Sequence, residues 1–170
     1  WISSLDLSYF LTYPGATEAA ISQAETSLVV VFPGDYRSLL ARSNGIRLTS
    51  NKPDETFFLL DPIGTRWSDW ENESTVEEHN AAICDGPLAQ LLVIGTEPTS
   101  EAIGFMKEDI KPNSDNDPPV YLYFHEEDEF RKYANSFQHL MIHITSRGWH
   151  EKLSPPIRPD RPWWEFWNQG

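Results

Sequence analysis

The residues of this chain whose types and spacing suggest chemistry are mostly histidines. His139 and His143 lie four residues apart, so on a helix both imidazoles would share one face. A zincin helix needs glutamate directly after its first histidine, and Leu140 stands there, so the general base is missing. His79 and Cys84 are five residues apart, with no second cysteine and no evident third zinc ligand. We therefore expect no metal site.

The other reactive groups form no recognisable catalytic arrangement. Cys84 paired with His79 or His125 is formally a nucleophile and its base, but a single cysteine is far more often a buried structural residue. The glycines are isolated, so no phosphate-binding loop is present. Carboxylates are so abundant that no pair stands out as an acid–base dyad. We expect a protein that is not an enzyme and needs no cofactor.

The carboxylates gather in one part of the chain. Its 170 residues include 26 Asp and Glu against 13 Lys and Arg, which gives a net charge of -13. Residues 67–130 hold sixteen of the carboxylates and two lysines, so this segment carries -14 and the rest of the chain +1. Binding to nucleic acid or anionic lipid needs clustered Lys and Arg, so we expect neither as a partner. A charged partner would be a basic protein, although the same acids would also serve as solvated faces that keep the chain soluble.

Two candidate contact patches lie within this acidic segment. Trp67 and Trp70 are interspersed with acids, and binding hot spots favour Trp rimmed by charge; the alternative is that both belong to the core. The predicted turn at 126–129 is the second patch, and its alternative is a solvated hairpin tip. The residues expected to contact a partner are Trp67, Asp69, Trp70, Glu71, Glu73, Glu77, Glu78, Glu126, Glu127, Asp128 and Glu129.

The length predicts one domain, over residues 1–150, followed by a Pro- and Trp-rich tail at 151–170. Four aromatic residues at 163–167 are too apolar to stay solvated together, so we expect the tail to dock on the domain rather than to bind a partner. No stretch approaches the ~18 apolar residues of a membrane span. The single cysteine allows no internal disulfide, and a cytoplasmic monomer or weak dimer is the default expectation.

The first part of the chain predicts helices. Residues 1–13 read as a short docked helix that Pro14-Gly15 ends. Thr17 is a plausible N-cap for an amphipathic helix over 18–28. A second helix over 33–44 has proline at its start and Asn-Gly at its end, which is the usual placement of both residue types.

From residue 46 onward, apolar alternation or short apolar runs predict strands at 46–48, 56–60, 90–94, 102–106, 120–124 and 130–134. A helix over 75–84 with Ser74 as its cap is expected among them, and Ser136 is expected to cap a last helix that ends near Gly148. The fold class is therefore α+β. Two N-terminal helices pack on an antiparallel sheet of about five or six strands, and a C-terminal helix closes the domain.

These residues also resemble a known family. The run ATEAAISQAETSLVVVFPGDYRSLLARSNGIRL resembles the opening of SUKH superfamily domains, named for the yeast cell-wall assembly regulator and its bacterial relatives. Later pieces, LLVIGTEPTSEAIGF and PPVYLYFHEEDEFRKYANSFQHLMI, follow in the family order, so the resemblance covers about residues 16–146. The matching positions are Ile21, Glu25, Pro33, Asp35, Tyr36, Leu39, Leu40, Asn44, Gly45, Ala134, Ser136, Phe137 and Leu140.

The resemblance implies binding rather than catalysis. Bacterial members act largely as immunity proteins that neutralise a cognate toxin, often a nuclease, and fungal members are non-enzymatic regulators of cell-wall synthesis. The chain departs from the family at the central turn, where residues 97–100 lack the usual Gly and Asp, and beyond about Gly148, where the tail has no counterpart. The expected function is an immunity protein that acts through its acidic surface. The alternative is a regulatory or scaffold domain, in which the tail would matter more.

Overall fold

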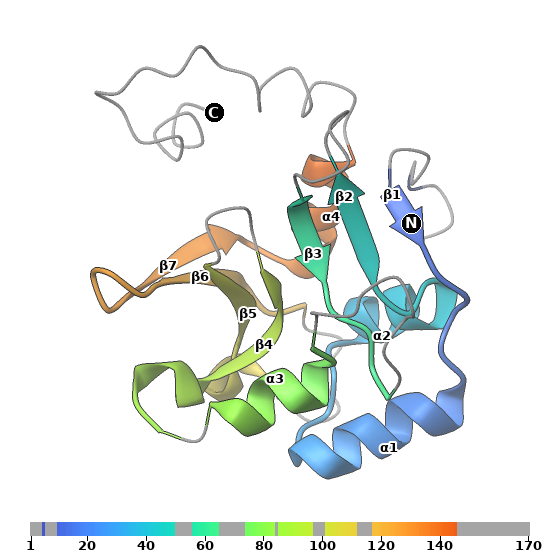
Figure 1. The fold of residues 1–170 in the computed structure, drawn as a ribbon, viewed down its shortest axis with the longest axis horizontal. Helices are drawn as coiled ribbons and strands as arrows, with labels where there is room; N and C mark the ends of the chain where they lie inside the picture. Colours follow the sequence, from blue (N-terminus) through green and yellow to red (C-terminus); the bar gives the residue numbers. More distant parts are fainter. Residues whose placement is uncertain are drawn as a thin grey trace.

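Seven antiparallel strands form one sheet, in which each strand pairs with the next along the chain (Figure 1). The computed structural model describes residue 5 and residues 10–49, 56–64, 74–83, 85–96, 101–111 and 117–145. The strands are β1 (Phe10–Thr12), β2 (Ile46–Thr49), β3 (Thr56–Leu60), β4 (Leu91–Thr96), β5 (Ala102–Met106), β6 (Val120–Phe124) and β7 (Glu129–Ala134). The predicted class, α+β with an antiparallel sheet, is confirmed.

The sheet has one strand more than the upper expectation. Strand β1 lies where a short docked helix was predicted, and it pairs Phe10 with Leu48 and Thr12 with Ile46. Three residues are too few to show the alternation by which a strand is recognised in a sequence. The pairing with β2 therefore decides the conformation of this segment, and the helix prediction for the described residues 10–12 was wrong.

Two helices follow β1, as predicted: α1 (Glu18–Leu28) and α2 (Gly34–Arg42). The Thr17 hydroxyl accepts the Ala20 N–H at 3.2 Å, which confirms it as the N-cap of α1. Glu25 accepts the backbone N–H of Phe32 at 2.8 Å and pairs with Arg37 of α2. One carboxylate thus ties the connector between the helices to both of them.

Helix α3 (Val76–Ala82) corrects the predicted cap. Thr75, not Ser74, accepts the N–H of Glu78, and the Glu78 carboxylate accepts the N–H of Thr75 at 2.9 Å. This reciprocal capping box needs Glu or Gln three residues after the cap. Glu77, which Ser74 would have used, instead accepts the backbone N–H of Gly64.

The last helix and two short helical turns complete the described chain. Helix α4 (Phe137–Ile144) has the predicted cap, because the Ser136 hydroxyl accepts the His139 N–H at 3.0 Å. Single 3-10 turns, η2 (Pro87–Gln90) and η3 (Lys107–Asp109), lie at the same end of the β4–β5 pair, where Leu91 lies opposite Met106. No helix among the described residues is long and apolar enough to cross a membrane.

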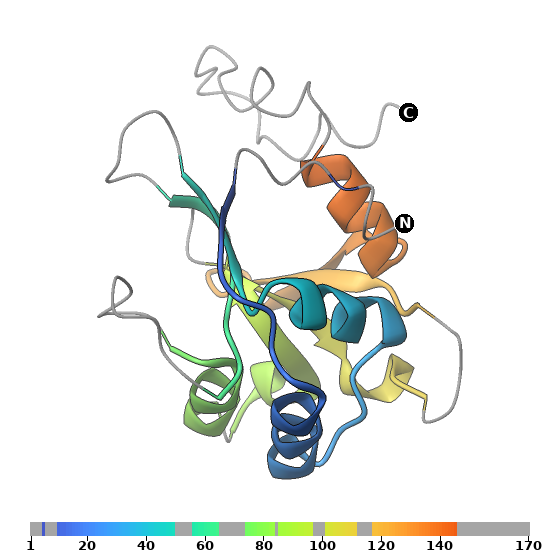
Figure 2. The same ribbon diagram turned by 90° about the vertical axis from the view of Figure 1, so that its right-hand side faces the viewer.

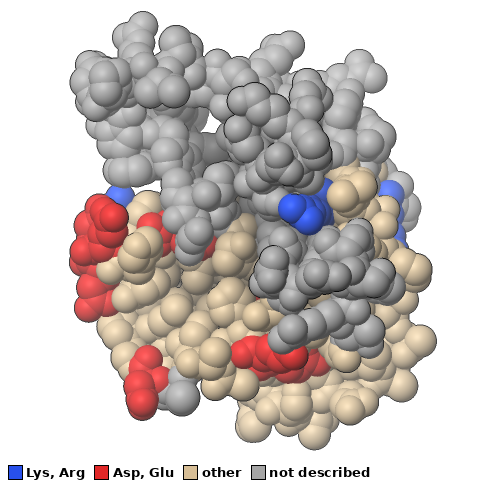
Figure 3. Space-filling view, in the orientation of Figure 1, with Lys and Arg blue, Asp and Glu red and all other residues tan. Residues whose placement is uncertain are grey.

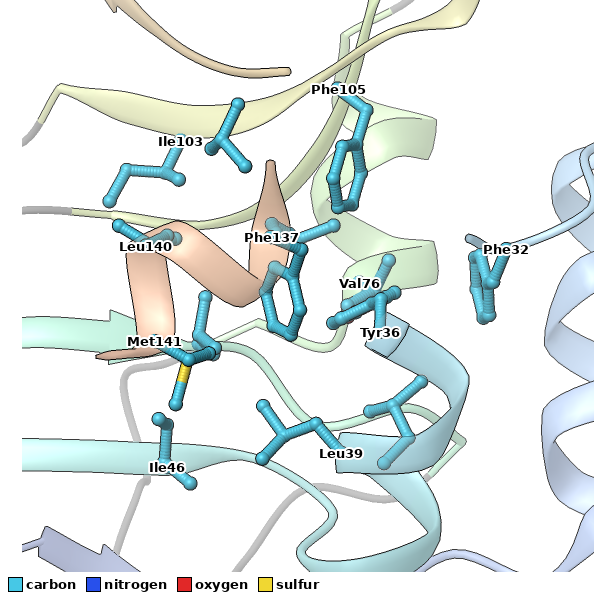
Figure 4. Close-up of a cluster of buried hydrophobic side chains, with 14 of the residues drawn as sticks. Phe32, Tyr36, Leu39, Ile46, Val76, Ile103, Phe105, Phe137, Leu140 and Met141 are labelled. Atoms are coloured by element: carbon cyan, nitrogen blue, oxygen red, sulfur yellow. The ribbon is translucent and has the colours of Figure 1, made fainter. Parts of the chain in front are cut away.

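The main core lies between the sheet and helices α1, α2 and α4, with α4 and α3 on opposite sides of β4–β7 (Figure 2). Tyr36 lies at its centre, with its ring 5.3 Å from those of Phe32 and Phe137 and 5.8 Å from that of Phe105 (Figure 4). Alternate residues of β6 face this core, so the intervening ones face the opposite side of the sheet. There Leu91 of β4 belongs to a second, smaller apolar cluster.

Candidate functional site

Among the described residues, four of the predicted contact residues lie together in the turn between β6 and β7. We call Glu126, Glu127, Asp128 and Glu129 the acidic turn. All four are exposed, and pairing of Phe124 with Glu129 closes the hairpin below them. Figure 3 shows acidic side chains at the tip of this hairpin, at the left edge of the molecule. The hairpin therefore presents several negative charges together to solvent.

Asp128 gives the acidic turn its shape. Its backbone is left-handed, with φ of 53°, a conformation that Asp adopts more readily than most residues. The Tyr123 hydroxyl donates to Asp128 Oδ1 at 2.6 Å. This hydrogen bond is the main cause of a raised Tyr123 pKa, so the hydroxyl keeps its proton and remains a donor. The bond joins the turn to the strand below it.

Glu101, immediately before β5, holds the other side of the turn. Its side chain is 8% exposed, and its Oε2 accepts the backbone N–H of His125 at 3.0 Å. The same oxygen lies 3.2 Å from His125 Nδ1. A buried carboxylate needs such partners, because an uncompensated buried charge is costly. Glu101 thus fixes the residue that immediately precedes the acidic turn, from a position next to the neighbouring strand β5.

Arg131 engages one further carboxylate of the turn. Its Nη2 donates to Glu129 at 2.9 Å, and its guanidinium lies 4.3 Å from the centroid of the Phe124 ring. The hydrogen bond to Glu129 is the main cause of a raised Arg131 pKa. Asp128 and Glu129 therefore have intramolecular partners, whereas Glu126 and Glu127 make no hydrogen bond or ion pair with the described residues. These two carboxylates are available to a partner.

The residues that carry the family resemblance hold the fold instead. Tyr36 is wholly buried, and burial raises the pKa of its hydroxyl, which has no hydrogen-bond partner among the described residues. The buried Asn44 amide donates to the Ile63 carbonyl at 3.0 Å and accepts the Ile63 N–H at 2.9 Å. Together with Glu25 between α1 and α2, these residues form a scaffold that is separate from the acidic turn.

Residues 15–143 match the SMI1 / KNR4 family (SUKH-1), which is about three-quarters of the chain. The chain belongs to this family. SUKH domains include toxin-immunity proteins. The resemblance drawn from the sequence is confirmed, and the matched residues reach from the turn before α1 into α4. No curated protein matches the chain.

The SUKH domain places the other predicted contact residues apart from the acidic turn. Figure 3 shows acidic side chains over α3 well separated from the hairpin tip. There Glu77 accepts the Gly64 N–H at 3.0 Å and Glu78 closes the capping box, so both carboxylates have local structural roles. Five further residues lie outside the described ones and stay predictions: Trp67, Asp69, Trp70, Glu71 and Glu73.

Two of the histidines considered for catalysis, His79 and His139, lie in different parts of the SUKH domain. His79 Nδ1 lies 3.0 Å from Asp61 Oδ2, and burial raises the pKa of this aspartate although the histidine opposes the shift. His139 lies exposed on the first turn of α4. Cys84 and the tail lie outside the described residues. Within the described ranges, no group of three or more His, Cys, Asp and Glu side chains is placed to hold a metal ion.

Proposed function

We propose that this SUKH domain is a non-enzymatic binding protein that neutralises a basic toxin domain, and that the acidic turn makes the first contact. The observation that carries the proposal is the combination of exposure and rigidity in this turn. Four adjacent residues are acidic, and two of them make no hydrogen bond or ion pair with the described residues. Glu101 fixes the His125 backbone before them, and Tyr123 fixes the Asp128 side chain. A fixed cluster of charge loses little conformational freedom when it binds.

The chemistry favours a basic partner. Carboxylates on a solvent-exposed turn create a negative field that raises the encounter rate with a positive surface. Nucleases have basic clefts for phosphate, so a cluster of carboxylates would compete for the same groups. This mode of inhibition needs no catalytic group on the SUKH domain, in keeping with the expectation that the chain is not an enzyme.

The test is co-expression with a candidate toxin, namely any small basic domain that a gene next to this chain's gene encodes, with growth as the measurement. The wild-type chain should restore growth. Glu126→Lys/Glu127→Lys should weaken binding by about tenfold or more and lose protection, because both side chains then repel the partner. Asp128 is left unchanged, since its bond to Tyr123 shapes the turn.

The matched control compares two single charge reversals at exposed positions: Glu127→Lys inside the acidic turn and Asp85→Lys outside it. Asp85, between α3 and η2, is exposed and lies outside the acidic turn. Asp85→Lys changes the net charge by the same amount as Glu127→Lys, so only the latter should reduce protection clearly. Equal effects of both substitutions would mean that net charge, not the acidic turn, governs binding. Full protection by the double reversal would remove the turn from the proposed interface.

A further inference from the structure

The sheet face opposite α4 carries aromatic side chains next to the acidic turn. Tyr121 and Tyr123 of β6 and Phe130 of β7 are partly exposed there. We call these three residues the aromatic strip. Ile83 and Leu88, from the segment that joins α3 to β4, pack on the same apolar cluster. Among the described residues, Figure 1 shows no helix in front of β6 and β7, and Figure 3 shows mostly uncharged surface between the hairpin tip and α3.

Register makes the aromatic strip a fixed platform. Tyr123 lies directly opposite Phe130 in the ladder, and their ring centroids are 5.0 Å apart. Tyr121 lies two residues before Tyr123 on the same face, opposite Lys132. The rings are therefore held by backbone pairing, as the large rigid side chains of binding hot spots usually are.

Carboxylates border the aromatic strip at both ends. The Tyr123 hydroxyl donates to Asp128, and the Tyr121 hydroxyl donates to Asp109 Oδ2 at 3.3 Å. Burial is the main cause of a raised Tyr121 pKa, and Asp109 adds to it, so this hydroxyl also remains a donor. Each tyrosine thus places an aromatic face beside a carboxylate.

An aromatic face beside a carboxylate suits one side chain in particular. The arginine guanidinium stacks flat on a ring and donates in its own plane to carboxylate oxygens, whereas the lysine ammonium is a compact and more strongly hydrated charge. Lys107, Lys132 and Arg131 are among the cations near the aromatic strip and the acidic turn. Lys107 Nζ donates to the Ala89 carbonyl at 2.8 Å, and Arg131 pairs with Glu129. The region is nevertheless negative, because it holds the carboxylates of the acidic turn and, in η3, those of Glu108 and Asp109.

We propose that the aromatic strip is the docking surface for an arginine-bearing segment of the basic partner that the acidic turn attracts. This inference rests on the proposed function and adds the part of the interface that holds the partner after encounter. Arginine would stack on Tyr123 and Phe130 while it donates to Asp128. The strip would then govern the dissociation rate, and Glu126 and Glu127 the association rate.

The test is titration of the full chain with an oligoarginine peptide at low salt. Binding is monitored through changes in the backbone amide chemical shifts of the chain. The largest changes should lie at the aromatic strip and the acidic turn. Tyr121→Ala/Tyr123→Ala should weaken binding by about tenfold, whereas Tyr121→Phe/Tyr123→Phe should stay within about threefold, because the rings remain. An oligolysine peptide of equal length should bind several times more weakly (about threefold or more).

A further variant keeps the test valid if the double alanine variant does not fold. Lys132 is exposed on the same face, opposite Tyr121, so Lys132→Glu should tighten oligoarginine binding by roughly threefold. Shift changes confined to the acidic turn or to α3 would overturn the proposal. Equal affinity for arginine and lysine peptides would do the same.

Protection against the toxin separates this inference from the proposed function. If Glu126→Lys/Glu127→Lys abolishes protection and folded Tyr121→Ala/Tyr123→Ala protects fully, the strip is not part of the interface and the proposed function stands. If the wild-type chain protects against no basic toxin domain while oligoarginine still binds at the strip, the proposed function fails and the chemical preference of the strip stands. Loss of protection in both variants, with protection kept in Tyr121→Phe/Tyr123→Phe, supports both, because the phenylalanine variant lacks the bond to Asp128 but keeps the rings.

Discussion

Among the described residues, two carboxylates are buried, and each has a histidine beside it. The Asp61 side chain is 2% exposed and contacts His79, and the Glu101 side chain is 8% exposed and contacts His125. Burial disfavours the ionised form of a carboxylate, and a nearby histidine favours it. For Asp61 the burial effect is the larger of the two, so its pKa in the folded protein lies above the ordinary value. Folded protein thus binds this proton more tightly than unfolded protein does.

The stabilising effect of this proton fades as pH rises. It is fully present below the unfolded pKa of about 3.9 and is lost as pH rises through the higher folded pKa. As Asp61 ionises above about pH 4, the free energy of unfolding of the wild-type protein should fall. The total fall is roughly 1.4 kcal/mol for each unit by which the folded pKa exceeds the unfolded pKa. Asp61→Asn cannot ionise, so this part of the fall should be absent in the variant. Urea unfolding between about pH 4 and pH 7 measures this slope.

Asp85→Asn is the control for the Asp61 experiment, because Asp85 is exposed and the substitution removes the same charge. Its pH slope should follow that of the wild-type protein. An unchanged slope in Asp61→Asn, or equal slopes in both variants, would contradict the assignment of the raised pKa to burial at Asp61.

In helix α3, two adjacent residues, Ser74 and Thr75, could each cap the helix, and Thr75 does so. Thr75 and Glu78 satisfy each other's backbone N–H groups. Thr75→Ala should lower the free energy of unfolding by about 1 kcal/mol, whereas Ser74→Ala should change it by less than about 0.5 kcal/mol. Urea unfolding of both variants gives the comparison, and a larger loss in Ser74→Ala would contradict the observed cap.

The sequence predicts those elements whose signals are local. Helices α1 and α4 have their own caps at Thr17 and Ser136, and the alternation in β6 defines a strand by itself. Strand β1 has no such signal, because its conformation depends on pairing with β2, more than thirty residues away. The choice between Ser74 and Thr75 likewise depends on Gly64, which competes for Glu77.

In the candidate site, too, the sequence predicts the features with local signals and misses those that depend on distant contacts. The acidic turn follows directly from four acids between two strand patterns. The support from Glu101 does not, because it reaches His125 across 24 residues of chain through the β5–β6 register. The tyrosines of the aromatic strip are visible as alternate residues of β6, but only the packing of α4 decides which face remains open.

At the scale of the whole molecule, scaffold and contact surface occupy different residues. The family motif residues lie in the core or between helices, and the acidic turn lies at the tip of a hairpin. The acidic segment itself is divided, since Glu101 supports the turn and Asp117 accepts the backbone N–H groups of Phe137 and Gln138 at the start of α4. Only part of the segment's charge is therefore available to a partner.

The association rate of the chain with the proposed basic toxin domain, measured across ionic strength, tests the central claim most directly. If the acidic turn attracts this partner through its field, as proposed, the wild-type rate should fall at least about tenfold between about 20 mM and about 500 mM salt. Glu126→Lys/Glu127→Lys should lose most of this dependence, while Asp85→Lys should keep it. A wild-type rate that does not change with salt, or an equal dependence in the double reversal, would contradict binding through the acidic turn.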